Sequence, residues 1–297
     1  MSPVTERRLQ ANGLAFNLAE AGDGPPVLLL HGFPDSWRLW RLQLAALAEA
    51  GHRAIAPDLR GFGETDRPTG VEHYKLRTLV NDVVGLLDVL EVERAAVVGH
   101  DWGAALAWAV ARFVPDRVSR LVVVSVGHPL ANAAAGLAQR QLSWYMLWFL
   151  FPGVAERVLP QDDWAVFRRW AWNGARRGED PDLDRQLADL SRPGALVAGL
   201  NWYRANIDPA TFIISDPTRI SVPPVACPTM GVWSSDDFAL TEGQMTGSER
   251  LVSGPWRYER LDGVDHWVPV HAHERLNELL VDFLDESSAR LAPRLPR

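Results

Sequence analysis

Short, mostly apolar runs alternate with helical patterns over the first 126 residues of the chain. The apolar runs have the length and the β-branched content of strands covered on both faces, and they lie at residues 26–30, 53–57, 95–98 and 118–126. Apolar residues recur with helical spacing in the segments between them, at 38–50, 76–90 and 102–113. Strands that alternate with helices predict an α/β fold built on a mostly parallel, doubly wound sheet.

The two ends of the chain extend this pattern. An imperfect alternation over residues 7–20 surrounds Asn12-Gly13, a dipeptide typical of tight hairpin turns, and predicts two antiparallel edge strands. Near the C-terminus the pattern predicts strands at 229–233 and 256–261, a helix from about 242 and a last helix over 273–286. We expect the tail after Ser287 to be loosely ordered.

The alternation stops between residues 128 and 222. This segment is rich in Ala and Arg, is punctuated by Pro and Gly, and has no run typical of a buried strand. It also holds six of the 13 Trp and two of the four Tyr, and aromatic residues at helical spacing are usually core residues. We therefore expect a core domain of residues 1–127 and 223–297 with an inserted helical cap of residues 128–222.

Composition excludes several classes of function. The 297 residues are 47% hydrophobic and carry a formal charge of −7 without a basic stripe, so nucleic acid is not an expected partner. The single Cys227 excludes an internal disulfide, and its position at a strand start predicts a buried, inert thiol. No run of 18 consecutive apolar residues occurs and the first residues have no apolar signal region, so we expect a cytoplasmic protein without membrane insertion.

The candidate chemistry centres on Asp101 in the sequence GHDWG at 99–103. The residue lies between an apolar strand and a helix, with glycines two positions before and after it, which is typical of a sharp turn. Such a turn presents the carboxylate at the C-terminal end of a strand, where the first N–H groups of the helix favour its ionised form. The alternative is that Asp101 only caps the helix.

Two further residues match the partners that a nucleophile needs. Asp237 follows the 229–233 strand, with Asp236 as the less favoured choice, and His266 follows the 256–261 strand. Loops at the C-terminal ends of parallel strands lie at one edge of a sheet, so an acid and a base can meet Asp101 there. The pair His271 and His273 has no third ligand nearby, and we expect surface residues and no metal.

Several motifs together resemble the epoxide hydrolase branch of the α/β-hydrolase family, over about residues 14–285. These motifs are HGFPDSW at 31–37, DLRGFGETDRP at 58–68, GHDWG at 99–103, PGVAE at 152–156 and NWYRAN at 201–206. The order nucleophile, acid, histidine is also the chain order of that family. Leu150 stands where the family often has Gln, and Ser234 where it usually has Gly. These two departures bear on substrate range more than on chemistry.

The resemblance implies an α/β-hydrolase fold with an inserted cap, and an enzyme that converts epoxides to vicinal diols without a cofactor or a metal. Asp101 would attack the epoxide and form a covalent ester, while Tyr145 and Tyr203 of the cap donate to the ring oxygen. His266, oriented by Asp237, would activate the water that hydrolyses the ester. The backbone N–H groups of the two oxyanion-hole residues, Phe33 and Trp102, would hold the oxyanion.

We expect the substrate to be a small apolar epoxide. Five residues of the loops around the site are candidates for contact with it: His31, Pro34, Trp37, His128 and Trp267. A haloalkane dehalogenase would use the same Asp, His and Asp, and Trp102 beside the nucleophile suits a halide, although Phe33 stands where a halide-binding Asn is expected. A third alternative is a receptor of the hydrolase fold, which binds a ligand under the cap. A homodimer is compatible with the sequence.

Overall fold

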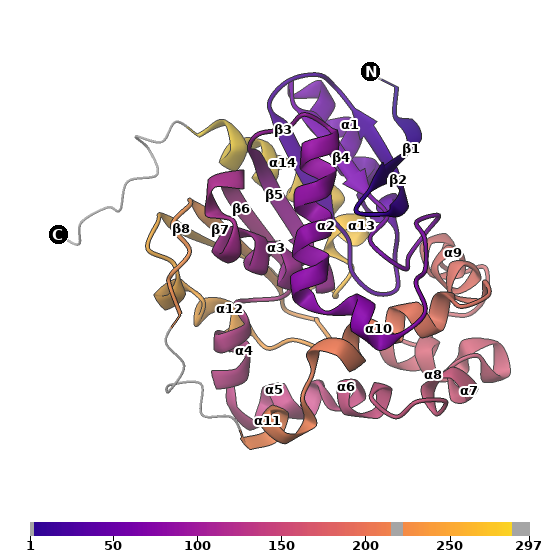
Figure 1. The fold of residues 1–297 in the computed structure, drawn as a ribbon. Coiled ribbons are helices and arrows are strands. Elements are labelled where there is room, and N and C mark those ends of the chain that lie inside the picture. The colour runs from indigo at the N-terminus through magenta and orange to yellow at the C-terminus, as the bar shows by residue number, and fades with distance from the viewer. Residues whose placement is uncertain (1–2, 215–221, 287–297) are drawn as a thin grey trace.

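A mostly parallel sheet forms the centre of the computed structural model, which describes residues 3–214 and 222–286 (Figure 1). The eight strands lie in the order β1-β2-β4-β3-β5-β6-β7-β8. Their bounds are β1 Thr5–Ala11, β2 Leu14–Ala21, β3 Pro26–Leu30, β4 Arg53–Pro57, β5 Ala95–His100, β6 Val118–Val124, β7 Thr229–Ser234 and β8 Trp256–Leu261. The six strands β3 to β8 are joined by parallel pairings, which confirms the predicted fold class.

The predicted hairpin opens the sheet. Strands β1 and β2 pair in antiparallel register up to Ala11 and Leu14, and β2 then pairs antiparallel with β4. Asn12 has φ 50° and Gly13 has φ 76°, so both turn residues are in the left-handed region that this dipeptide tolerates. The turn chemistry read from the sequence therefore fixes this edge of the sheet.

Helices cover both faces of the sheet. The helices of the sheet domain are α1 Arg41–Glu49, α2 Leu76–Val89, α3 Trp102–Phe113, α12 Glu242–Thr246, α13 Val268–His271 and α14 His273–Asp285. Helix α3 packs on β5 and β6 next to α2, whereas α1 packs with α14 behind the strands (Figure 1). All six residues of β5 are buried, as expected for a strand covered on both sides.

The regular elements in the described part of the segment between β6 and β7 are all helices. Its helices are α4 Pro129–Ala134, α5 Gly136–Leu142, α6 Trp144–Phe149, α7 Ala155–Val158, α8 Gln161–Ala171, α9 Pro181–Leu190, α10 Ala195–Asn206 and α11 Pro209–Ile214. Figure 1 shows them gathered at one end of the sheet. We use "cap" for the predicted unit 128–222, whose boundaries remain a prediction.

Some local expectations need correction. The helix expected from Arg38 begins as a 3₁₀ turn over Trp37–Trp40, with Ser36 as its N-cap, and α12 is only five residues long. The strand expected to reach Val126 ends at Val124. Of the six cap tryptophans, three are buried, two are half-buried, and Trp144 is 48% exposed. The tail after Ser287 lies outside the described residues.

Among the residues that the structure describes, no helix has the length and apolar character needed to cross a membrane.

Two glycines allow strand β5 and helix α3 to lie in close contact. A Cβ added at Gly99 would lie 2.3 Å from the carbonyl oxygen of Gly103, and one added at Gly103 would lie 2.0 Å from that of Leu30. Real Cβ atoms do not approach backbone oxygens so closely. The two glycines of the GHDWG motif are therefore required by backbone packing, as the sequence predicted.

We predict that Gly103→Ala destabilises the protein by about 3 kcal/mol, the upper part of the usual range for overpacking, because β3 or α3 must move. Urea denaturation followed by circular dichroism measures this change. Gly243→Ala in α12 is the matched control, since a Cβ there has no atom within 4 Å, and it should leave stability within about 1 kcal/mol of wild type. Equal stabilities of the two variants would contradict the packing argument.

Candidate active site

Asp101 lies at the junction of β5 and α3 in a backbone conformation that few non-glycine residues adopt. Its φ is 53° and its ψ is −124°. The side chain makes no capping hydrogen bond to α3. Instead, its Oδ1 accepts a hydrogen bond of 2.9 Å from the backbone N–H of Phe33. The reading of Asp101 as a simple helix cap is therefore not supported by the geometry.

The charge state of Asp101 follows from its neighbours. Burial by itself would raise the pKa of the carboxyl group, but His266 and the backbone N–H of Trp102 hold that pKa below its ordinary value. Asp101 is therefore ionised at neutral pH although its side chain is only 12% exposed. A buried carboxylate of this kind is a ready nucleophile for a saturated carbon.

His266 lies between two carboxylates. Its Nδ1 is 2.8 Å from Oδ2 of Asp237, and its Nε2 is 3.7 Å from Oδ2 of Asp101. The other oxygen of Asp237 accepts hydrogen bonds from the backbone N–H groups of Ala239 and Leu240, at 2.8 and 3.1 Å. These bonds fix the carboxylate that orients the imidazole ring. Asp236, the alternative acid, is exposed and bonds to its neighbour Ser235.

Burial lowers the pKa of His266, but the carboxylates of Asp237 and Asp101 outweigh this effect and raise the pKa to about 10. The imidazole is therefore charged in the resting protein, and it forms a buried ion pair network with the two aspartates. A charged imidazole is no base. The pKa of His266 depends on the charge of Asp101. Of the two carboxylates, Asp101 is the one that lines the cavity.

His100 is a neighbour of the site that sequence reasoning missed. Its Nε2 lies 2.9 Å from the backbone carbonyl oxygen of His266, and the two rings have their centroids 4.7 Å apart. Burial and the nearby charge of His266 lower the pKa of His100 to about 4, so the ring is neutral. A carbonyl only accepts, so His100 donates this bond and helps to hold the His266 loop. The position of His100 directly before Asp101 was the only feature of the sequence that indicated its place in the site.

The two cap tyrosines reach the same place from different helices. Tyr145 of α6 and Tyr203 of α10 are both buried, and their ring centroids are 6.2 Å apart. Burial, and next the negative charge of Asp101, raise both phenol pKa values well above 10. Both hydroxyl groups are therefore protonated at any physiological pH and are available as donors.

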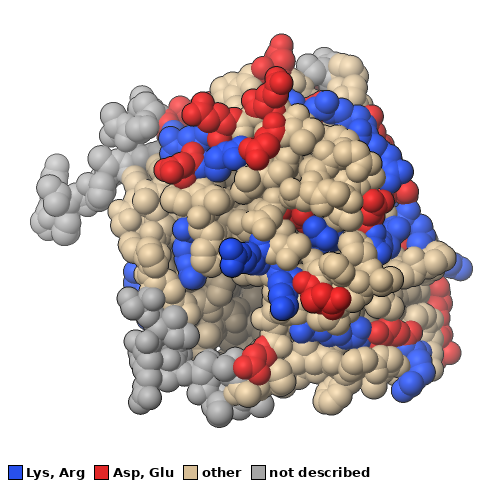
Figure 2. All heavy atoms as spheres, in the orientation of Figure 1, with Lys and Arg blue, Asp and Glu red and all other residues tan. Residues whose placement is uncertain are grey.

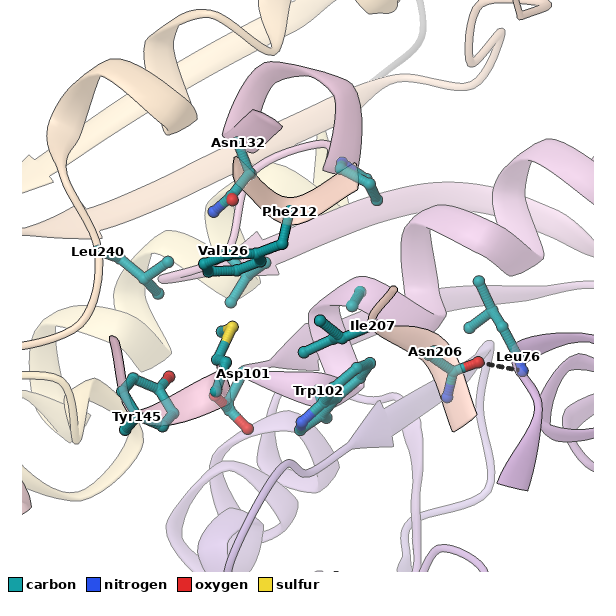
Figure 3. Close-up of a pocket in the computed structure, with 14 residues that line it drawn as sticks. Leu76, Asp101, Trp102, Val126, Asn132, Tyr145, Asn206, Ile207, Phe212 and Leu240 are labelled. Carbon is teal, nitrogen blue, oxygen red and sulfur yellow. Dashed lines mark hydrogen bonds between the residues drawn. The ribbon is translucent and has the colours of Figure 1, made fainter. Parts of the chain in front are cut away.

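A cavity of about 240 Å³ opens beside Asp101, and Tyr145 lines it together with mostly apolar side chains (Figure 3). Its lining consists of Leu76, Asp101, Trp102, Ala105, Val126, Gly127, Pro129, Asn132, Tyr145, Met146, Asn206, Ile207, Phe212 and Leu240. An apolar cavity with a few convergent polar groups is the usual form of a small-molecule site.

Known proteins of this architecture are similar to the chain over nearly its whole length. The family described as the alpha/beta hydrolase fold matches residues 25–270. The chain belongs to this family. Epoxide hydrolase A of Mycobacterium tuberculosis is 32% identical over 96% of this chain and 98% of its own length. Epoxide hydrolase 4 of Homo sapiens is 32% identical over 95% of this chain and 79% of its own.

Solved structures agree with these relatives. A structure described as one of the novel epoxide hydrolases in metagenomes from hot environments superimposes with a TM-score of 0.85, at 29% identity, and covers 96% of this chain and 100% of its own. Epoxide hydrolase A from Mycobacterium thermoresistibile gives a TM-score of 0.79 at 31% identity, with 95% and 98% covered. The chain thus lies in the epoxide hydrolase branch of the α/β hydrolases.

The five residues expected to contact substrate do not line the cavity beside Asp101. His31, for instance, is fully buried and accepts a hydrogen bond from the backbone N–H of Leu59 through its Nε2. Trp37 carries the guanidinium of Arg38 over its ring, and Pro34 follows the cis peptide bond after Phe33. These residues build the loop that positions the Phe33 N–H.

The other two expected contacts also support neighbouring segments. His128 is buried, and its Nδ1 accepts from the backbone N–H of Leu130, so it caps α4. Trp267 stacks on Trp172 at 4.5 Å and donates its indole N–H to the carbonyl of Ala171. The side chains that do line the cavity are apolar, and no sequence pattern separates them from ordinary core residues.

The remaining histidine candidates lie apart from the cavity. His271 bonds to Asp265 through Nδ1 and to Asp180 through Nε2, at 2.9 and 3.3 Å. His273 Nδ1 meets the carbonyl of Val270. Within residues 3–214 and 222–286, no cluster of three or more His, Cys, Asp or Glu has the arrangement of a metal site.

We predict that Asp101→Asn lowers the pKa of His266 by about one unit or more, because removal of an opposite charge at 3.7 Å disfavours the charged imidazole. NMR titration of ¹⁵N-labelled histidine rings measures the value. His271 is the internal control, since Asp265 and Asp180 raise its pKa and Asp101 is not among the causes. A His266 pKa that stays near that of wild type would show that Asp101 does not set it.

Proposed function

We propose that this protein hydrolyses epoxides to vicinal diols through a covalent ester on Asp101. One observation carries the proposal: two buried, protonated phenols of the cap lie over an ionised carboxylate that faces an apolar cavity. A nucleophile opposite two proton donors suits a three-membered ether, whose carbon is attacked while its oxygen takes up charge. The names of the similar epoxide hydrolases support the same reaction.

The first step forms the ester. Oδ1 of Asp101 is held by the N–H of Phe33, so Oδ2, which lies 3.7 Å from Nε2 of His266, is the attacking oxygen. Its electron pair attacks a ring carbon, the C–O bond of the ring breaks, and the electrons of that bond move to the epoxide oxygen. Tyr145 and Tyr203 donate hydrogen bonds to this oxygen as its charge develops. No base is needed, since the carboxylate is already ionised.

Formation of the ester removes the negative charge of Asp101, and this changes His266. One of the two carboxylates that raise the pKa of the imidazole is then neutral, so that pKa falls and the ring releases its proton more easily. The alkoxide formed in the first step accepts the proton that His266 releases and becomes the first hydroxyl group of the diol. His266 thus becomes a base only after the alkylation has taken place.

The second step hydrolyses the ester. Neutral His266 takes a proton from water, and the hydroxide attacks the carbonyl carbon of the Asp101 ester. The resulting oxyanion is Oδ1, which the N–H groups of Phe33 and Trp102 stabilise. Asp237 stabilises the imidazolium that forms. Collapse of the tetrahedral intermediate breaks the Cγ–Oδ2 bond, so Oδ2 leaves with the substrate carbon, takes the proton from His266 and becomes the second hydroxyl group of the diol. The new Asp101 carboxyl group, which holds the water oxygen, then returns its proton to His266.

A haloalkane dehalogenase is the second candidate, and the place of Trp102 in the cavity lining favours it. A halide, however, leaves as a stable anion and needs no proton donor, so that reaction gives Tyr145 and Tyr203 no function. A receptor of this fold would bind without turnover. The complete set of Asp101, His266 and Asp237 supports turnover instead.

The covalent ester is the decisive test. We predict that His266→Ala, incubated with 1,2-epoxybutane, gains the mass of one substrate molecule and keeps it, because the first step needs no base. Intact-protein mass spectrometry measures the adduct. Asp101→Ala is the control and should show no adduct. A single turnover of wild type in H₂¹⁸O should place the label in Asp101. Label found only in the diol would exclude the ester.

The tyrosines are tested separately. We predict that Tyr145→Phe and Tyr203→Phe each lower kcat for 1,2-epoxybutane about tenfold to a thousandfold, the range for loss of a transition-state donor, and that the double variant has almost no activity. The change removes one hydroxyl and keeps the ring, so thermal unfolding serves as the check on packing. If the double variant keeps its epoxide activity, or if wild type turns over 1-chlorobutane faster, the dehalogenase reaction is the better assignment.

A further inference from the structure

The cavity leaves Asp101 in one direction. It passes Trp102 and Ala105 on α3 and reaches Val126 after β6 and Phe212 on α11. Figure 3 shows Asp101 with Tyr145 and Trp102 at one end of this space, and Val126 and Phe212 further away. Most side chains along this path are apolar, with Asn132 as an exception, so the path favours an apolar group.

In another direction from Asp101, a row of aromatic rings fills the space. Phe33 contacts Phe167 with ring centroids 6.2 Å apart, Phe167 contacts Trp170 at 5.7 Å, and Trp170 contacts Phe238 at 5.2 Å. Phe238 in turn lies with its ring 5.2 Å from His266. We call these four residues, Phe33, Phe167, Trp170 and Phe238, the ring wall. It runs without a break from the oxyanion loop to the histidine.

The cap tyrosines separate the cavity from the ring wall. Tyr145 lines the cavity and also packs on Trp170, with centroids 4.4 Å apart. Tyr203 meets Phe33 at 5.6 Å and Trp102 at 5.1 Å. An epoxide oxygen held by both hydroxyl groups therefore has open space on one side and packed rings on the other.

The ring wall leaves no room for a substituent of the substrate, because its rings pack against one another. Phe33 and Phe167 are 5% and 1% exposed, and each contact in the row has near-perpendicular rings at the usual separation. Placing an alkyl chain there would require displacement of at least one ring from its packed position. Close-packed interiors oppose such displacements, and even one extra methylene is disfavoured.

From this asymmetry, and resting on the proposed function, the geometry points to a substrate class. We propose that the protein acts on terminal epoxides with one apolar substituent, and discriminates against trans-1,2-disubstituted epoxides. In a terminal epoxide, the substituted carbon points its chain along the cavity and the CH₂ carbon faces the ring wall. A trans-disubstituted epoxide always directs a second chain to the opposite side, where the ring wall stands.

Two isomers of one formula test the proposal, 1,2-epoxyoctane and trans-4,5-epoxyoctane. Both have eight carbons and similar hydrophobicity, so a difference in rate reports shape. We predict that kcat/KM for the terminal isomer exceeds that for the internal isomer by about a hundredfold or more, since a misplaced alkyl group in a pocket changes rates by ten to two hundredfold per methylene. Diol release is measured by gas chromatography. Equal values, or a preference for the internal isomer, would overturn the proposal.

Variants locate the cause of the preference. Trp170→Ala removes one of the two half-buried members of the ring wall and should move the ratio of the two kcat/KM values about tenfold toward the internal isomer. Phe238→Ala should shift this ratio in the same direction. It serves as the second variant if Trp170→Ala fails to fold. A ratio unchanged in every folded ring-wall variant would overturn the assignment.

The matched change on the open side is Ala105→Leu, which narrows the cavity. It should lower kcat/KM for 1,2-epoxyoctane more than for 1,2-epoxypropane, whose methyl group needs little room. Equal effects on both substrates would show that the chain does not lie in this cavity and would also overturn the proposal. Absence of diol from all of these epoxides would instead reject the proposed function, so the two failures are distinguishable.

Discussion

The arrangement of the site depends on the turn at Asp101, where the backbone is held in a conformation that side-chain sterics disfavour. A non-glycine residue with φ 53° and ψ −124° costs about 1–3 kcal/mol, and the surrounding structure must supply this energy. It does so through the close contact of β5 with α3 at Gly99 and Gly103, and through the bond from Phe33 N–H to the carboxylate. The strain aims the side chain away from the helix and toward the cavity.

The charge of Asp101, in this position, determines the charge state of His266. Two carboxylates next to one imidazole keep His266 charged at rest, and the pKa of about 10 reflects their joint effect. Only one of them can lose its charge by chemistry, because Asp237 is fully bonded to backbone N–H groups and to the ring. The charges therefore determine the order of the two proposed steps. Ester formation neutralises Asp101 and lowers the pKa of His266, so the base becomes available when the ester must be hydrolysed.

Sequence patterns predicted the sheet closely because burial imposes a periodicity on it. The bounds of β4, β8 and α3 agree with the predicted ranges, and the hairpin followed from Asn12-Gly13. The approach of Asp101, His266 and Asp237 was also predictable, since strand order brings loop residues to one edge. His31 and Trp267, two of the expected substrate contacts, are buried, bond to neighbouring segments and do not line the cavity beside Asp101. Motif membership does not say whether a side chain points into a cavity or toward a neighbouring loop.

The sequence did not predict in which direction the cavity extends from Asp101, because that direction depends on how the cap packs on the sheet domain. Phe167 and Phe212 are both apolar cap residues on short helices, yet one packs into the ring wall and the other lines the open space. The difference arises from how the cap docks on the sheet domain, which depends on contacts between residues more than 100 positions apart. Local periodicity carries no information on such contacts.

Polar contacts hold the cap at the side of the ring wall. Arg185 and Gln186 of α9 bond to the two oxygens of Asp35 in the loop after β3, at 2.8 and 2.7 Å, and Asp182 pairs with Arg41 of α1. Burial would raise the pKa of Asp35, but Arg185 keeps it below its ordinary value, so the pair is charged.

A buried ion pair adds little net stability, since desolvation offsets most of the attraction, but it penalises any other arrangement of its partners. Asp35 lies two residues after Phe33, whose N–H bonds to Asp101 and whose ring begins the ring wall. The α9 contacts therefore couple the position of the cap to the oxyanion loop directly.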